Sequence, residues 1–101
     1  MSTTNYINGA QQRVLKTLAL LCGHEVFGLK PTEIAKGVGT SLSNVTRDLA
    51  NLREAGFAEP LENGFWRVTP RVGQLFLRML NALDAARDRV EETRQRFVTH
   101  R

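Results

Sequence analysis

The sequence predicts a mainly α-helical fold with one small β-hairpin, and three observations support this. Apolar residues recur at helical spacing in three segments before Gly56. Asn63-Gly64, a frequent hairpin turn, separates two short segments that contain aromatic residues. Beyond Pro70 the apolar residues follow a heptad spacing. A chain of 101 residues has the size of one domain.

The first helix is predicted from Gly9 to Cys22. Asn8 can cap it, and Gln11, three residues later, completes a capping-box pattern. Gly23 supplies a stop. The single cysteine excludes an internal disulfide and a cysteine-based zinc site. Because Cys22 lies in an apolar run, we expect a buried, unreactive thiol.

A connection over residues 24–30 leads to a short second helix. We expect Phe27 and Leu29 to enter the core from this connection. Pro31 suits the first helical turn, where its missing amide hydrogen costs nothing. The inward face of this helix should consist of Ile34, Ala35 and Val38.

The third helix is predicted over residues 41–55, after a tight turn. Ser41 or Thr40 can cap it, and Gly56 can end it. At 100° per residue, one stripe of this helix is apolar and is expected to be buried. The stripe consists of Val45, Leu49 and Leu52.

The hairpin is predicted over residues 57–68, with its turn at 60–64. Strand alternation places Trp66 and Val68 in the core and Arg67 outside. A helix, a second helix, a tight turn, a third helix and a hairpin form, in this order, a winged helix-turn-helix. In that fold the second helix of the motif enters the major groove of double-stranded DNA, and the hairpin is the wing.

The outward face of the third helix carries side chains suited to base contacts, namely Ser43, Asn44 and Arg47. Arginine can pair with guanine through two hydrogen bonds and asparagine with adenine, while serine bonds to either base or phosphate. A solvated polar face is the alternative interpretation. Contacts to the DNA backbone are expected from Lys36, Thr40, Ser41, Thr46 and Arg67.

This region resembles the N-terminal winged-helix DNA-binding domain of the IclR (isocitrate lyase regulator) family, with MarR-like winged helices as second choice. The likeness runs from Val14 to Leu75. It rests on Gly28-Leu29, Thr32-Glu33-Ile34-Ala35, Val38-Gly39, Ser43-Asn44-Val45-Thr46-Arg47, Leu49, Leu52, Glu54-Ala55-Gly56-Phe57 and the segment from Asn63 to Arg71.

The resemblance implies that Ser43, Asn44 and Arg47 occupy recognition-helix positions. The family also carries a large ligand-sensing domain, which this sequence lacks, so we expect no small-molecule effector. Asp48 stands where an apolar residue is common in the family.

Residues 71–101 are predicted to form a long dimerisation helix with a heptad seam. The seam residues are Val72, Phe76, Met79, Leu83, Ala86, Val90, Thr93 and Phe97. In a parallel homodimer, Arg89 would face Arg94 of the other copy, which is repulsive. The second half of the helix therefore either frays or meets an acidic partner or flanking DNA.

Together these features predict a dimeric, sequence-specific regulator of transcription, a repressor rather than an activator. Residues 1–70 would bind DNA and residues 71–101 would dimerise, within one compact unit. The alternative is a winged-helix protein-interaction module such as an adaptor or inhibitor. It is favoured by the small charge of residues 1–70, with seven basic and six acidic side chains.

Other functional classes find little support in the sequence. His24 and His100 are isolated, and no catalytic constellation, metal-ligand spacing or phosphate-binding loop is visible, so no enzyme, metal or cofactor is expected. The sequence contains no signal peptide and no membrane-spanning stretch. We therefore expect a cytoplasmic protein with no membrane partner.

Overall fold

The structure is a computed structural model, and it describes residues 6–99. Its contacts divide the chain into two units, of which the first ends at Arg71 and the second begins at Val72. A single compact unit was expected from the sequence. Each unit is described by itself below.

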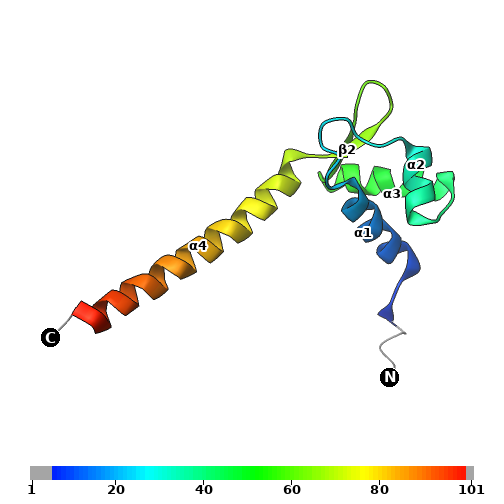
Figure 1. Ribbon diagram of the computed structural model, residues 1–101. Coiled ribbons are helices and arrows are strands. Elements are labelled where there is room, and N and C mark those ends of the chain that lie inside the picture. Colours follow the sequence, from blue (N-terminus) through cyan, green and yellow to red (C-terminus); the bar gives the residue numbers. More distant parts are fainter. Residues whose placement is uncertain (1–5, 100–101) are drawn as a thin grey trace. The chain divides into compact units, whose positions relative to one another are not determined.

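The first unit contains three helices and a hairpin, in the order that the sequence predicts (Figure 1). The mainly helical winged-helix fold is therefore confirmed. The elements are α1 (Gly9–Leu21), α2 (Pro31–Val38), α3 (Leu42–Glu54), β1 (Ala58–Pro60) and β2 (Trp66–Val68). The second unit consists of helix α4 (Pro70–Thr99) without its first two residues, which belong to the first unit.

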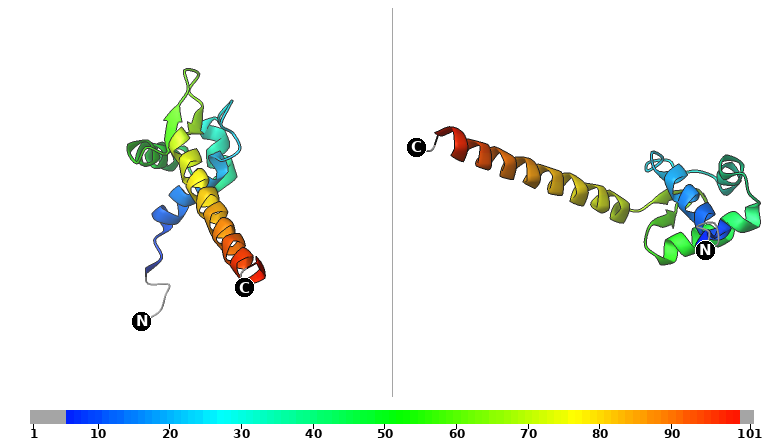
Figure 2. Two further views of the ribbon diagram at one scale, coloured as in Figure 1. Left: turned by 90° about the vertical axis from the view of Figure 1, so that its left-hand side faces the viewer. Right: turned by 90° about the horizontal axis from the view of Figure 1, so that it is seen from below.

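The core of the first unit lies where the three helices meet each other and the hairpin. Helix α1 contacts α2, α3 and β2, and α3 also contacts α2 and β1. Figure 2 shows this group from two further directions. Its buried apolar side chains are Leu21, Ile34, Val45, Leu49, Leu52, Ala58 and Val68. The predicted buried stripe of α3 is thus confirmed, and the opposite side of α3 is left outside the core.

Capping side chains set the starts of α1 and α3. The Asn8 side-chain oxygen accepts a hydrogen bond from the Gln11 amide at 2.9 Å, as predicted. At α3, the Ser41 hydroxyl accepts from the Asn44 amide at 3.2 Å, so Ser41 is the cap. Helix α1 ends one residue earlier than predicted, with Cys22 at its C-cap.

The hairpin is extended by one residue of the preceding connection. Strands β1 and β2 are antiparallel, with Glu59 opposite Arg67. Leu29 forms an isolated bridge with Trp66, in which each amide donates to the other residue's carbonyl, at 2.8 and 2.9 Å. Gly28, with φ of 72°, makes this approach possible, because a Cβ there would lie 2.8 Å from the Trp66 carbonyl oxygen.

Two predictions near this connection are wrong. Phe27 is 80% exposed, because the turn at Gly28 presents Leu29 to the hairpin and leaves Phe27 outside. Cys22 is exposed, because it follows the last turn of α1.

Helix α4 differs from the others in having no fully buried side chain among its described residues. Val72 is half-buried, and the side chains that follow it are exposed. Nowhere between residues 6 and 99 is a helix both long and apolar enough to cross a membrane.

Candidate nucleic-acid interface

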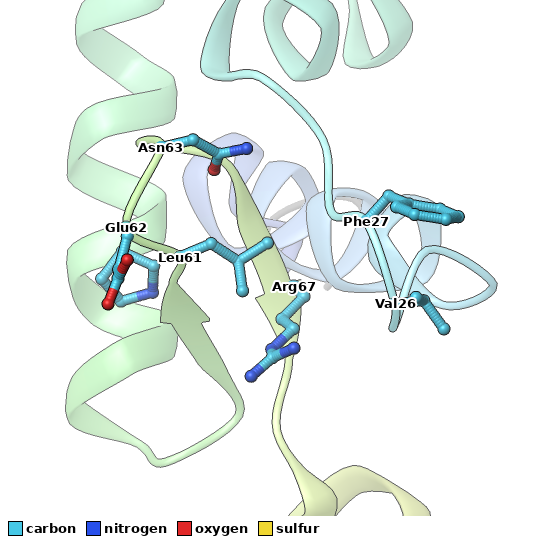
Figure 3. A pocket seen from close by; sticks show the side chains of 7 residues that line it. Val26, Phe27, Leu61, Glu62, Asn63 and Arg67 are labelled. Carbon is cyan, nitrogen blue, oxygen red and sulfur yellow. The ribbon is translucent and has the colours of Figure 1, made fainter.

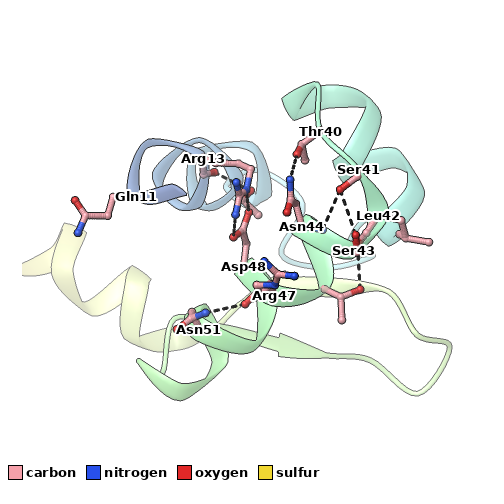
Figure 4. Close-up of polar contacts among 12 residues, drawn as sticks. Gln11, Arg13, Thr40, Ser41, Leu42, Ser43, Asn44, Arg47, Asp48 and Asn51 are labelled. Atoms are coloured by element: carbon pink, nitrogen blue, oxygen red, sulfur yellow. Dashed lines mark hydrogen bonds and ion pairs between the residues drawn. The ribbon is translucent and has the colours of Figure 1, made fainter. Parts of the chain in front are cut away.

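The candidate interface is the face of α3 opposite its buried stripe (Figure 4). Ser43, Thr46 and Arg47 are exposed on this helix, whereas Asn44 is half-buried. An α-helix has 3.6 residues per turn, so side chains that pack against the core and side chains that point to solvent lie on opposite sides of α3. The packing that buries the stripe therefore fixes which side of α3 faces outward.

Arg47 is the exposed cation near the middle of this face. Within the described part of the chain, no acidic group lies within ion-pair distance of its guanidinium. Asn51, one turn later, donates from its side-chain nitrogen to the Arg47 carbonyl at 2.9 Å. The five N–H donors of Arg47 are thus available to an external acceptor such as a guanine edge or a phosphate.

The start of α3 holds a small network of polar side chains. Asn44 donates from its side-chain nitrogen to the Thr40 hydroxyl at 2.9 Å, and the hydroxyls of Ser41 and Ser43 lie 3.4 Å apart. Thr46 donates to the Leu42 carbonyl at 3.0 Å. Asn44 therefore keeps its side-chain oxygen and one N–H for an outside partner, while Thr40 orients it.

The residues predicted to contact the DNA backbone differ in how freely their side chains could reach a phosphate. Lys36 is exposed in the last turn of α2. Arg67 of the wing is half-buried, and its Nε lies 3.5 Å from a Glu59 carboxylate oxygen across the hairpin. A phosphate would have to compete with Glu59 for this guanidinium.

An ion pair that the sequence analysis missed joins α1 to α3. Asp48 is 2% exposed, and its two oxygens accept from Nε and Nη2 of Arg13 at 2.6 and 2.9 Å. The hydrogen bond with Asp48 raises the pKa of Arg13 above its usual value, so this guanidinium stays charged. Asp48 can be buried at this position because a bidentate partner reaches it from α1.

Both residues of this ion pair line a groove between α1 and α3. The groove has a volume of about 580 Å³. Arg47 and Asn51 line it from α3, and Ala10, Val14 and Leu15 form its apolar side on α1. The Arg13–Asp48 pair therefore fixes the helix directly beside the candidate base-contacting arginine. The signal in the sequence is that Asp48 lies one turn after Val45, on the buried side of α3, where an acid needs a partner; it does not identify Arg13.

A second hollow lies between the wing and the connection that precedes α2 (Figure 3). Its volume is about 610 Å³. Val26 and Phe27 border it on one side, and Leu61, Asn63 and Arg67 border it on the other. Phe27 and Val26 expose most of their surface, so this is an apolar patch beside the wing.

The predicted dimerisation residues of α4 are exposed to solvent, except Val72, which is half-buried. The exposed ones are Phe76, Met79, Leu83 and Val90. Because they are three, four and seven positions apart, they share one side of the helix. No group of three or more potential metal ligands occurs between residues 6 and 99.

One solved structure supports this interpretation of the fold. The chain is similar to the Zalpha domain of ORF112 from Cyprinid Herpesvirus3, in a structure that describes its binding to Z-DNA. The two are 28% identical with a TM-score of 0.52, over 58% of this chain and 95% of the other. This likeness confirms the winged helix, while membership of the IclR family stays a prediction. No protein-family description and no curated protein matches the sequence.

Proposed function

We propose that this chain is a dimeric regulator of transcription that binds double-stranded DNA sequence-specifically, with α3 in the major groove and the hairpin as wing. The exposed guanidinium of Arg47 carries this proposal. It stands on the side of α3 opposite Val45 and Leu49, where the described residues offer it no acidic partner. The Z-DNA bound by the similar Zalpha domain supports a nucleic-acid partner.

Within this proposal, Arg47 makes the main base contact. Ser43 and Asn44 contact neighbouring bases from the first turns of the helix, where a recognition helix reaches base edges first. The contacts to phosphate come from Lys36, Thr40, Ser41, Thr46 and Arg67. Since Arg67 also pairs with Glu59, we expect its contribution to be smaller than that of Lys36.

Dimerisation would supply the second half of the binding site. One recognition helix makes few base contacts, and two half-sites about one turn of DNA apart give useful specificity. The first half of α4 offers the apolar surface for this, from Val72 to Leu83. A dimer bound to such a site would exclude other proteins from it, so repression needs no additional surface.

The experiment that tests this proposal compares two arginines of α3. DNA sites would first be selected from random oligonucleotides with the full chain, and affinities would then be measured by fluorescence anisotropy. We expect Arg47→Ala to weaken binding by about 1–3 kcal/mol, roughly 5- to 150-fold, and to relax the preference at one base pair.

Arg53→Ala is the matched control, because it removes the same charge from the same helix at a different angular position. Arg53 is exposed in the last turn of α3, on the flank rather than on the outward face. A small, sequence-independent loss is expected for this variant. Equal losses for both variants would show that only bulk charge matters, and an unchanged affinity for Arg47→Ala would remove α3 from the interface.

Binding to left-handed DNA is a second candidate function, because the similar Zalpha domain is described bound to Z-DNA. In that mode the protein would recognise the shape of the backbone, and no selected B-form sequence would be preferred. A methylated CG-repeat duplex, measured in salt that holds it in the left-handed form and again in the right-handed form, distinguishes the two. Tighter binding to the left-handed form would favour this second candidate.

A further inference from the structure

The second half of α4, residues 84–99, has an unusual arrangement of charges. Val90 and Phe97 lie on the apolar seam and are 67% and 83% exposed. Arginines border the seam on both sides, at the heptad positions next to it. These arginines are Arg87 and Arg94 on one side, and Arg89 and Arg96 on the other.

The acidic residues of this segment lie on the opposite side of the helix. They are Asp84, Asp88, Glu91 and Glu92. They reach the arginines only at the edge of ion-pair distance, between 3.5 and 3.9 Å, and all the groups involved are exposed. Such pairs add little, because water screens them. Arg96 has no ion-pair partner within residues 6–99.

Two paired α4 helices do not place acids at the positions that flank the seam. In α4, these positions are occupied by Gly73, Leu75, Leu80, Ala82 and the four arginines. None is acidic, so a seam-to-seam pair of α4 helices, parallel or antiparallel, sets the flanking arginines against flanking arginines or uncharged residues. Like charges across such an interface oppose pairing. The apolar first half of the helix is therefore better suited to self-association than the second half.

DNA is the less suitable partner for this segment. The four arginines of residues 84–99 border two apolar side chains and do not form a continuous basic face for a phosphate backbone. Phosphate contacts would also leave Val90 and Phe97 exposed to water. A protein helix can bury both of these side chains and neutralise the bordering arginines at once.

We propose that residues 84–99 of α4 are a docking surface for an acidic amphipathic helix of a different protein. The partner helix would place apolar side chains against Val90 and Phe97, and Asp or Glu opposite the four arginines. Its glutamates or aspartates would reach the guanidinium groups in paired hydrogen bonds. This inference does not depend on the proposed binding of DNA.

The test uses two designed helical peptides that share an apolar heptad seam. One carries Glu at all positions that flank the seam, and the other carries Lys there. Binding of each labelled peptide to the full chain would be measured by fluorescence anisotropy. We expect the acidic peptide to bind at least about tenfold more tightly than the basic one, with the difference shrinking at high salt.

Two variants make the result specific to this surface. The fourfold variant R87E/R89E/R94E/R96E should reverse the preference, so that the basic peptide binds more tightly. Phe97→Ser should weaken the acidic peptide about tenfold while leaving the preference intact, because the seam loses one apolar contact. Circular dichroism would show that α4 remains helical in both.

Several outcomes would overturn the proposal. Equal binding of both peptides, or an acidic preference that persists in the fourfold variant, would place the contact elsewhere. Slow hydrogen exchange along residues 84–99 in the chain alone, at concentrations where it dimerises, would show that a second copy occupies the seam. Tighter binding of unselected double-stranded DNA than of the acidic peptide, lost in the fourfold variant, would assign the segment to DNA.

Discussion

Helices α3 and α4 both have an apolar side, but only that of α3 is buried within the chain. Helix α3 has 13 residues, and Val45, Asp48, Leu49 and Leu52 among them are buried inside the same chain. Helix α4 has 30 residues and a longer apolar pattern, yet none of its described side chains is fully buried. The apolar periodicity of a helix thus indicates that a partner exists, but not whether that partner belongs to the same molecule.

The charged residues of the two helices differ in the same way. Asp48 of α3 is satisfied by Arg13 of α1 through two hydrogen bonds. The arginines of α4 have only loose pairs with neighbours on their own helix. Helix α3 is therefore positioned from within, which suits an element that must present side chains in a fixed geometry.

The largest expected effect comes from breaking the core contact of α3. Leu49→Ala should lower the free energy of unfolding of the first unit by about 3 kcal/mol, because it leaves a cavity among buried side chains. Urea denaturation followed by the fluorescence of Trp66, the single tryptophan, would measure it. Leu83→Ala is the matched control on α4 and should change this value by less than about 0.5 kcal/mol.

The opposite result in the control would be informative. If Leu83→Ala destabilised the first unit as strongly as Leu49→Ala at concentrations below dimerisation, the second unit would contribute to the same folding transition. The conclusion that α3 stabilises the first unit and α4 does not would then be wrong.

A smaller effect is expected from the ion pair that fixes α3. Asp48→Ala should lower the Tm of the first unit by about 5–10 °C, because it leaves the guanidinium of Arg13, 20% exposed, without its partner. Arg89→Ala on α4 should leave the Tm unchanged. The double variant with Arg13→Ala should lose less than the sum of the two single changes, as calorimetry would show. Additive losses would mean that the two side chains do not act together.

Much of the fold could be predicted because it depends on local signals. The caps at Asn8 and Ser41 and the stripe of α3 follow from spacing alone, and the structure contains them. The exposure of Phe27 could not be predicted in this way. It depends on the bridge between Leu29 and Trp66, which are 37 positions apart in the sequence.

The candidate site was predicted less completely, for a physical reason. Arg47 could be placed on the outward face from helical geometry. The Arg13–Asp48 pair spans 35 positions, and helical periodicity carries no information about contacts between helices. The hydrogen bond between Thr40 and Asn44 is local, but two polar side chains next to a helix start can equally face water.

The smallest effect concerns the start of α3. Ser41→Ala should lower the free energy of unfolding by about 1 kcal/mol, because the amide of Asn44 loses its acceptor. Thr93→Ala on α4 is the control, since Thr93 is exposed and donates only to the Arg89 carbonyl of its own helix. Urea denaturation of both variants would measure this difference. Equal losses would show that hydroxyl groups stabilise both helices in the same way.

The two hydrogen bonds between Leu29 and Trp66 have a mechanical consequence. They connect Trp66, the residue of β2 next to the wing turn, to the segment that leads directly into α2, so the two cannot separate without breaking both bonds. A force on the tip of the hairpin would therefore be passed through these two bonds to the start of α2.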